Sequence, residues 1–410
     1  MEYLSSVVGS VLIPLFAVFL IAALGYALGG IKIKGISLGT AGVLVVALLY
    51  GIITTKITYV NDAGETVTGA FKFGSRIINL FNNSVKSNYT FVSNLGTDLF
   101  VTAVGLIAGP KFFRNFNRKT IGYVLMGLVV IATGVGITSL CISLFKVETP
   151  MALGLMTGAL TSTPGLSAAK EAVGEAGEAM ATAGYGIAYL FGVLGVVFFV
   201  QLMPKFLKTN VEEERKYVEA ANAVTMKNDG KKRLKLDSLG FFPFMLTVML
   251  GIILGSIKIP GINFSLGSSG GVLVMGLIIG HFGHLFGIDL TVDKKTLNFF
   301  RELGLCLFLI GAGVPGGANF IQNVRAEYFL IGIVITLIPM IVGYVFGRYV
   351  FKFRIFNNLA SITGGMTSTP ALGTLISVAG TDEISGCYAA TYPIALVFVV
   401  LASKIIPMIF

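Results

Sequence analysis

The sequence repeats one unusual segment, and this repeat restricts the possible folds more than any other feature. Residues 158–166 read GALTSTPGL and residues 364–372 read GGMTSTPAL. Each copy lies in a long apolar run, yet it contains three hydroxyl side chains, a proline and glycine, which interrupt a helix by removing an N–H group and by permitting unusual backbone angles. Proline also disfavours the helical conformation of the residue before it. We therefore expect a helix break at Thr163 and another at Thr369.

Composition indicates the surroundings in which these segments fold. Hydrophobic residues make up 55% of the 410 residues and charged residues 12%, and the mean hydropathy is +0.86. A soluble domain does not reach this balance, so we predict an all-α polytopic membrane protein in a lipid bilayer. The net charge of +10 comes from short basic segments between apolar runs. Short basic segments between apolar runs are typical of a membrane protein oriented by the positive-inside rule, so we expect no nucleic acid as a partner.

Apolar runs long enough to cross or nearly cross a bilayer recur along the chain, taking about 20 residues as the length of one span. They lie at 7–29, 39–55, 95–110, 120–145 and 181–203, and then at 240–256, 266–287, 299–317, 327–350 and 387–409. Two further runs, 150–169 and 357–377, contain the repeated segment. We interpret each as a re-entrant hairpin, because irregular backbone at membrane depth must be buried in protein or line a wet cavity. Each half then has five transmembrane helices and one hairpin, about ten spans in all.

The two halves match along most of their length. The hairpins match at an offset of 206 residues, and the spans that follow them match at an offset of 203, which pairs Tyr185 with Tyr388. An odd number of spans per half inserts the second copy upside down, so the sequence predicts an inverted repeat. Residues 1–204 form the first repeat, 205–237 a basic cytoplasmic linker, and 238–410 the second repeat.

The distribution of basic residues predicts the orientation of the chain. Lysine and arginine are denser in the loops that face inward if both termini lie outside. The positive-inside rule therefore predicts a multi-pass protein of the cytoplasmic membrane with both termini outside.

Three motifs connect the chain with a known family. They are the glycine pattern from Leu38-Gly39 to Gly51, the Leu95-Gly96 and Leu99-Phe100 motif, and the paired Thr-Ser-Thr-Pro segments. In these motifs the chain resembles the aspartate:alanine exchanger family of bacterial secondary transporters, and the resemblance covers both halves. It implies alternating-access exchange of a small carboxylate, an acidic amino acid or a dicarboxylate. Members of that family often carry soluble regulatory domains between the halves, whereas this chain has only the short linker.

Discontinuous helices in both halves of a transporter indicate its binding site. We expect the two hairpins to meet near the midplane and to hold a small anion, because a helix N-terminus presents about half a positive charge. Neither hairpin core contains a cation, so the carboxylate would be bound without a buried arginine. The alternative is that the hydroxyls only satisfy carbonyls freed by the bends. The substrate-binding candidates are Thr161, Ser162, Thr163, Pro164, Thr367, Ser368, Thr369 and Pro370.

Ionisable residues inside apolar runs are functional candidates, because burying a charge in a membrane is costly. Asp98 could bind a coupling cation or proton, or it could lie in the interface. Arg301 and Glu302 are interpreted as a pair at the membrane edge, where long side chains reach the interface. Lys170 and Glu171 follow the first hairpin and could gate it, although a solvated turn is the favoured interpretation.

Other polar residues favour structural roles. His281 and His284 lack a third metal ligand, and the three cysteines lack metal-ligand spacing, so we expect no metal and no cofactor. Gln201 and the tyrosine pairs on the spans after the hairpins could line the substrate path, but a shared helix face is more often a packing face. The tyrosine pairs are Tyr185 with Tyr189 and Tyr388 with Tyr392.

The sequence is also compatible with two other transport functions. An ion-coupled symporter or exporter of another small organic anion would share the same fold, and two facing hairpins could also frame a channel. An enzyme is not expected, because neither Ser162 nor Ser368 has a histidine nearby in the sequence. The glycine-rich first two spans of each half could form the interface of a homodimer.

Overall fold

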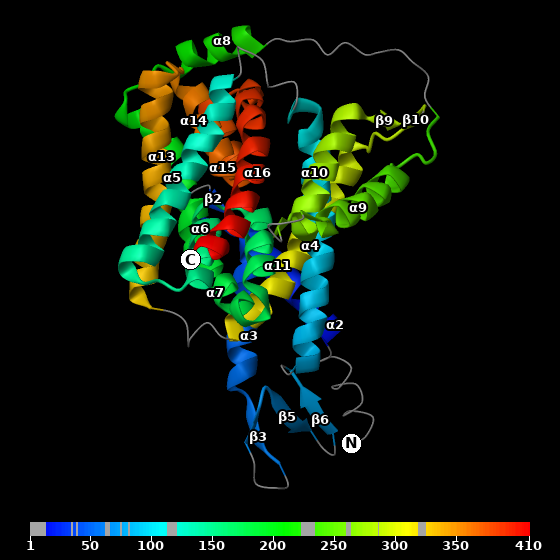
Figure 1. Cartoon of the computed structure of the whole chain (residues 1–410). Helices are drawn as coiled ribbons and strands as arrows, with labels where there is room; N and C mark the ends of the chain where they lie inside the picture. Colours follow the sequence, from blue (N-terminus) through cyan, green and yellow to red (C-terminus); the bar gives the residue numbers. More distant parts are fainter. Residues whose placement is uncertain are drawn as a thin grey trace.

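The structure is a computed structural model, and it describes residues 14–33, 36–37, 40–61, 66–73, 76–80, 83–112, 121–222, 234–259, 264–285, 287–318 and 325–410. These residues are mostly helical (Figure 1). The first residues of the expected span at 7–29 lie outside this set, as do Leu38 and Gly39 of the glycine pattern.

In the described part of the chain, six helices are long and apolar enough to cross a membrane, which supports a polytopic membrane protein. The helices that contain them are α4 (Asn83–Phe112), α5 (Ile121–Phe145), α7 (Thr163–Phe206), α11 (Lys294–Ala318), α13 (Ala326–Val345) and α16 (Ser385–Ile409), with α13 continuing into the π-helix η2 (Phe346–Val350).

Four shorter apolar helices lie at other places where the sequence predicts spans. They are α2 (Pro14–Gly30), α3 (Ala41–Lys56), α9 (Phe241–Ser256) and α10 (Gly267–Phe282). A helix of 16 residues is about 24 Å long, which is shorter than the roughly 30 Å hydrocarbon layer of a bilayer. Among the described residues, six helices are therefore clear candidate spans, and these four apolar helices are shorter.

The chain breaks its helices at both copies of the repeated segment. Helix α6 (Thr149–Ala159) is followed by α7 after a three-residue break, and α14 (Ile355–Gly365) is followed in the same way by α15 (Thr369–Ala379). Thr161 and Thr367 each have a φ of 52°, in the left-handed region that residues with a side chain rarely adopt. The proline at the second position of each new helix fits there, because its missing N–H has no intrahelical partner at that place.

The match between the halves extends to backbone angles. Three pairs of residues separated by 206 positions share a positive φ: Lys146 with Lys352, Thr161 with Thr367, and Gly174 with Gly380. Gly174 interrupts the helical angles within α7, so α7 consists of a short arm followed by a long span. In the second half, the 3-10 helix η3 (Asp382–Ile384) separates the corresponding arm α15 from α16.

The long helices of the two halves pack at glycines. A Cβ at Gly96 of α4 would collide with the backbone of α11, and a Cβ at Gly304 of α11 would collide with the backbone of α4. Glycine allows this approach, which is how membrane helices associate without a hydrophobic force between them. Gly42 contacts Gly29 within the α2–α3 pair, and Gly271 contacts Gly255 within the α9–α10 pair, so these glycines pack each pair internally.

Short antiparallel strand pairs connect some helices, and the sequence analysis did not predict them. They are β1 (Lys32–Ile33) with β2 (Ile36–Ser37), β3 (Thr58–Val60) with β4 (Thr66–Thr68), β5 (Ala70–Phe73) with β6 (Arg76–Asn79), β7 (Lys258–Ile259) with β8 (Phe264–Ser265), and β9 (His284–Leu285) with β10 (Ile288–Asp289).

The segment between the halves contains a helix, α8 (Val211–Asn222), which packs against α14 and α15. Val218 of α8 is fully buried there. The Arg354 guanidinium lies 3.1 Å from the Glu213 carboxylate and 3.0 Å from that of Glu214. Figure 1 shows α8 across one end of the helices, with β3 to β6 beyond the other end. We call the α8 end the linker side.

Candidate functional site

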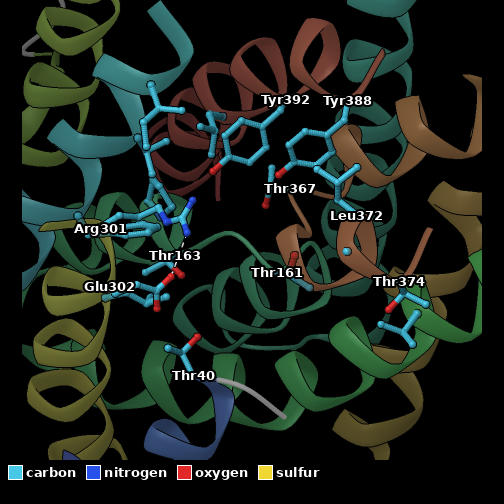
Figure 2. Close-up of a pocket in the computed structure, with 18 of the residues that line it drawn as sticks. Thr40, Thr161, Thr163, Arg301, Glu302, Thr367, Leu372, Thr374, Tyr388 and Tyr392 are labelled. Carbon is cyan, nitrogen blue, oxygen red and sulfur yellow. Dashed lines mark hydrogen bonds and ion pairs between the residues drawn. The ribbon is translucent and has the colours of Figure 1, made fainter. Parts of the chain in front are cut away.

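A cavity of about 940 Å³ opens where the two helix breaks approach each other. The first break contributes Thr161, Thr163 and Pro164 to its wall, and the second contributes Thr367. Helices α2, α4, α11, α15 and α16 supply most of the remaining wall (Figure 2). The cavity is mixed in character, because threonine, tyrosine and charged side chains alternate with leucine, valine and phenylalanine.

The two breaks are joined by a reciprocal pair of hydrogen bonds. Thr161 Oγ1 donates to the Met366 carbonyl at 2.8 Å, and Thr367 Oγ1 donates to the Leu160 carbonyl at 2.9 Å. Both threonines are almost fully buried. A helix break leaves carbonyls without intrahelical partners, and each break here supplies a donor to the other. These two hydroxyls therefore satisfy carbonyls freed by a bend, as the alternative interpretation of the sequence expects. Each carbonyl belongs to the opposite break rather than to the hydroxyl's own bend.

The second hydroxyl of each break differs between the halves. Ser162 Oγ accepts the Gly165 N–H at 3.2 Å and so caps the N-terminus of α7. Ser368 occupies the matching position, but its buried Oγ has no hydrogen-bond partner, and α15 has no side-chain cap. The N-terminus of α15 is thus the uncapped one of the two.

Of the remaining candidates of the repeated segment, Thr163 and Pro164 line the cavity. Thr163 Oγ1 is 3.2 Å from the Tyr185 hydroxyl, so the third hydroxyl of the first break also has a partner. Thr369 and Pro370 begin α15, and their side chains lie outside the described part of the structure.

Arg301 and Glu302 lie on the cavity wall, where the sequence analysis did not expect them. Figure 2 shows them side by side near Thr163, and their side chains are 3.0 Å apart. The Arg301 side chain is 30% exposed, so it is partly desolvated but accessible from the cavity. The expected pairing of the two residues is confirmed, and the structure adds that the pair lines the cavity. The available signal was the presence of an arginine within an apolar helix, which membrane energetics marks as functional.

Aromatic residues of the spans after the breaks line the cavity in addition to packing against one another. The lining includes Tyr189, Tyr388 and Tyr392, together with Gln201. The rings are also stacked in pairs, with centroids 4.9 Å apart for Tyr185 with Tyr189 and 5.0 Å apart for Tyr388 with Tyr392. These tyrosines therefore have both roles, because the rings stack in pairs and three of the four residues line the cavity.

Asp98 does not belong to the cavity wall. It lies on α4 against the start of α10, where Ser268 Oγ donates to its Oδ1 at 2.6 Å. The structure thus brings the repeated segments together and leaves the ion-coupling candidate at a separate contact between α4 and α10.

Lys170 and Glu171 form part of a polar contact behind the first break. Lys170 is only 6% exposed, and its Nζ lies 3.3 Å from Ser93 Oγ and 3.8 Å from the Glu178 carboxylate. The expected solvated turn is therefore wrong for Lys170. Glu171 binds Lys404 at 2.7 Å and accepts the Ser269 N–H at 3.1 Å.

Residues that could hold a metal do not gather within the described ranges, where no group of three or more histidine, cysteine, aspartate or glutamate side chains is found. The three cysteines are buried and unpaired with one another. The expectation of no metal and no cofactor stays a prediction.

A family model described as Predicted Permease Membrane Region (Asp-Al_Ex) matches residues 67–205 and 243–408, one stretch on each side of α8. A protein named uncharacterized transporter from Bacteroides thetaiotaomicron is 26% identical, over 95% of this chain and 97% of the relative. Similarly named proteins from Rhodopirellula baltica and Corynebacterium glutamicum are each 24% identical, over 95% and 96% of this chain and 98% of each relative.

These relatives are longer than the chain. Their alignments run over 551 to 557 positions, against 410 residues here, so the relatives carry segments that this chain lacks.

Proposed function

The chain belongs to the aspartate:alanine exchanger family of membrane permeases, and from that premise we propose that it is a secondary active transporter that exchanges small carboxylates. Its substrate is an acidic amino acid or a dicarboxylate, and it works by alternating access in the cytoplasmic membrane. The family membership supports a transporter, and the cavity at the crossed helix breaks supports the position of the substrate. No enzymatic step is part of this proposal.

The observation that carries the proposal is the pair of crossed breaks at one cavity. Thr161 and Thr367 bond to each other's segments, so the N-termini of α7 and α15 are held close together beside the cavity. The positive ends of two helix dipoles then favour an anion at that point. The free Ser368 hydroxyl, fully buried beside the uncapped start of α15, is an available donor.

Arg301 adds a full positive charge to this environment. Its guanidinium binds Glu302 in the structure, and the pair faces the cavity. A substrate carboxylate can replace Glu302 on the planar guanidinium through two parallel hydrogen bonds. Glu302 would then be available to an ammonium group, which an amino acid has and a dicarboxylate lacks. The tyrosines and Gln201 supply hydroxyl and amide groups around the same space.

The architecture that we propose is an inverted repeat. The six long helices and the four shorter apolar helices are ten spans, and α6–α7 and α14–α15 are re-entrant hairpins. Shorter helices are accommodated by local thinning of the bilayer or by burial in the assembly. With both termini outside, α8 and the basic linker are cytoplasmic. The repeats span 1–204 and 238–410, with 205–237 as the linker.

Movement of the hairpins against the other spans is the mechanism that we propose for access. In this elevator-like exchange, the two hairpins move together, since Thr161 and Thr367 tie them to each other. Asp98, in its contact with Ser268 between α4 and α10, is the proposed site for a coupling ion if transport is ion-driven. Replacing Asp98 with Asn would then abolish the dependence on that ion gradient, and an unchanged dependence would remove Asp98 from coupling.

A homodimer is also part of the proposal. The glycines of α2, α3, α9 and α10 pack within each helix pair, while large apolar side chains such as Phe19 and Ile253 face outward. A second copy would cover these faces in the membrane. Measurement of the mass of the protein in lipid nanodiscs tests this point, and a monomer at all protein concentrations would contradict it.

Uptake into proteoliposomes tests the proposed function. Labelled aspartate, glutamate and succinate are offered outside, with and without each unlabelled compound inside, and the sodium and proton gradients are set independently. Uptake that requires an internal carboxylate supports exchange. Uptake that follows an ion gradient with empty vesicles would instead identify a symporter, and single-channel currents would identify a channel.

A further inference from the structure

The two halves differ in how tightly the arm after each break is packed. In the second half, Leu372, Gly373 and Thr374 of α15 line the cavity, and Figure 2 shows Leu372 and Thr374 at its wall. The residues 206 positions earlier are Leu166, Ser167 and Ala168 of α7, which are 0%, 7% and 0% exposed. The structure therefore contains one open and one packed version of the same cleft.

The open cleft faces the linker side. Among its lining residues, Gln201 lies near the end of α7, and Arg301 lies near the start of α11. Helix α7 ends at Phe206 and α8 follows it in the chain, so the part of the cavity at Gln201 lies toward the linker side. The packed cleft belongs to the other half of the repeat and faces the opposite side if the repeat is inverted.

Charged residues join three elements over the packed cleft. Glu171 on the arm of α7 binds Lys404 near the end of α16 at 2.7 Å and accepts the N–H of Ser269 in the first turn of α10 at 3.1 Å. A carboxylate is stabilised at a helix N-terminus by the helix dipole. The side chains of Lys404 and Glu171 are 10% and 28% exposed, so their attraction is screened less than in a surface pair.

Further polar contacts tie the same arm to α4. Lys170 Nζ lies 3.3 Å from Ser93 Oγ, and Ser167 Oγ lies 3.4 Å from Thr97 Oγ1. The arm of α7 is thus held to α4, α10 and α16 at once.

The matching positions of the open cleft carry no charge. Glu171 matches Ser377 at the offset of 206, and Lys404 matches Gln201 at the offset of 203. Ser377 and Gln201 both line the open cavity. The Glu171–Lys404 ion pair therefore has no counterpart at the matching positions of the open cleft.

We propose that Glu171 and Lys404 form an ionic seal, anchored on the N-terminus of α10, which holds the entrance opposite the linker closed while the linker-side entrance is open. The seal rests on the proposed alternating-access function. Because Ser377 and Gln201 cannot form an ion pair, only one of the two entrances has such a seal, and the state closed opposite the linker is favoured at rest.

Cysteine accessibility tests the seal without any substrate. After the three native cysteines are replaced by alanine, Ser167→Cys reports on the packed cleft and Gly373→Cys on the open cleft at the matching position. A membrane-impermeant maleimide is added to either face of the membrane. We expect rapid labelling of the Gly373→Cys protein from the linker side, and slow labelling of the Ser167→Cys protein from both sides.

Loss of the ion pair should open the packed cleft. In the Ser167→Cys background, Glu171→Gln and Lys404→Gln should each raise the labelling rate from the side opposite the linker about tenfold. This factor lies between the effect expected for breaking a surface ion pair and that for breaking a buried one. Glu327→Gln is the matched control, because it removes an ion pair in which both side chains are more than half exposed, and it should leave labelling unchanged.

Folding is followed by the elution profile in detergent and by the labelling rate of Gly373→Cys, which should stay high from the linker side in every variant. Unchanged labelling of Ser167→Cys in both seal variants would overturn the proposal. The labelling experiment measures no transport, so its outcome for the seal is independent of the uptake experiment. A negative uptake result would contradict only the carboxylate function.

Discussion

The proposed site depends on the hydroxyl groups of Thr161 and Thr367. Each donates to a carbonyl of the opposite break, so the position of one break is defined by the other. The sequence predicts the breaks because proline and glycine are local signals. It could not predict the crossed bonds, because a bond over 205 or 207 residues depends on how the helices pack.

Replacing Thr367 or Thr161 with valine should impair transport. Each change leaves a buried carbonyl without its donor, at a cost of about 1–3 kcal/mol, and frees the two hairpins to separate. We expect at least about a tenfold loss of uptake rate, equivalent to about 1.4 kcal/mol, in protein that still elutes as a single folded species.

The matched controls for these variants are Thr157→Val and Thr363→Val. Both threonines are buried, lie one turn before the breaks and bond only to carbonyls of their own helix, at 2.8 and 2.7 Å. They should retain most of the uptake. Equal losses in the controls would mean that any buried threonine of the hairpins is needed, and would contradict a special role of the crossed bonds.

Arg301 provides the second prediction at this scale. Arg301→Gln keeps a polar side chain on the wall but removes the charge, so the apparent KM for a carboxylate should rise about tenfold or more. Arg301→Lys should recover only part of this loss, since lysine cannot bind a carboxylate in two-point geometry. Arg325→Gln, on an exposed ion pair, is the control, and an unchanged KM in Arg301→Gln would exclude the arginine from binding.

At the scale of elements, the helices and their breaks follow from the sequence more closely than the connections do. Apolar runs predict the positions of α5, α13 and α16 well, because length and hydropathy are local properties. The strands β3 to β6 were missed, since residues 56–94 contain no strong period-two pattern beside the long apolar runs. The position of Arg301 in the cavity was also missed, because it depends on how the helices pack against one another.

Helix α8 should stabilise α14 and the helix break that follows it. Glu213 and Glu214 bind Arg354 just before α14, and the Glu214 carboxylate raises the pKa of the Arg354 guanidinium. Arg354→Gln should lower the midpoint of thermal unfolding in detergent by a few degrees, because the partly buried Glu214 loses its partner. Lys216→Gln removes a fully surface pair on the same helix and serves as the control. Equal midpoints of thermal unfolding for the two variants would contradict a stabilising role of the ion pairs between Arg354 and α8.

Asp237 should make the stability of α9 depend on pH. Its carboxylate accepts backbone N–H groups at the start of α9, with the Phe242 N–H at 2.7 Å, and these bonds lower the pKa of Asp237 below its ordinary value. Because the pKa is lower in the folded state, the stabilisation is complete above the unfolded pKa of about 4 and is lost as the pH falls toward the folded pKa.

Asp237→Asn should therefore unfold at a lower temperature than the unchanged chain at pH 7, and the difference should shrink below about pH 4. Thermal unfolding in detergent at the two pH values measures this. A difference that does not depend on pH would show that the charge of Asp237 is not responsible.

At the scale of the whole molecule, the sequence repeat predicts two related halves, and the backbone angles at Thr161 and Thr367 agree with it. The repeat alone predicts equivalent clefts. It does not predict that one cleft is open and the other packed, because the same motif can adopt either arrangement in a protein with two conformations. The two clefts also differ in sequence, since the charged Glu171 stands where the other half has Ser377.

The central claim is that the cavity at the crossed breaks carries a carboxylate from one side of the membrane to the other by exchange. Counterflow of labelled aspartate into proteoliposomes tests it most directly, with unlabelled aspartate, glutamate, succinate or no carboxylate inside and no ion gradient. We predict rapid uptake with at least one of the internal carboxylates, little uptake into empty vesicles, and loss of the difference in Thr367→Val. Equal uptake into loaded and empty vesicles, or no uptake under any loading, would contradict exchange of these carboxylates.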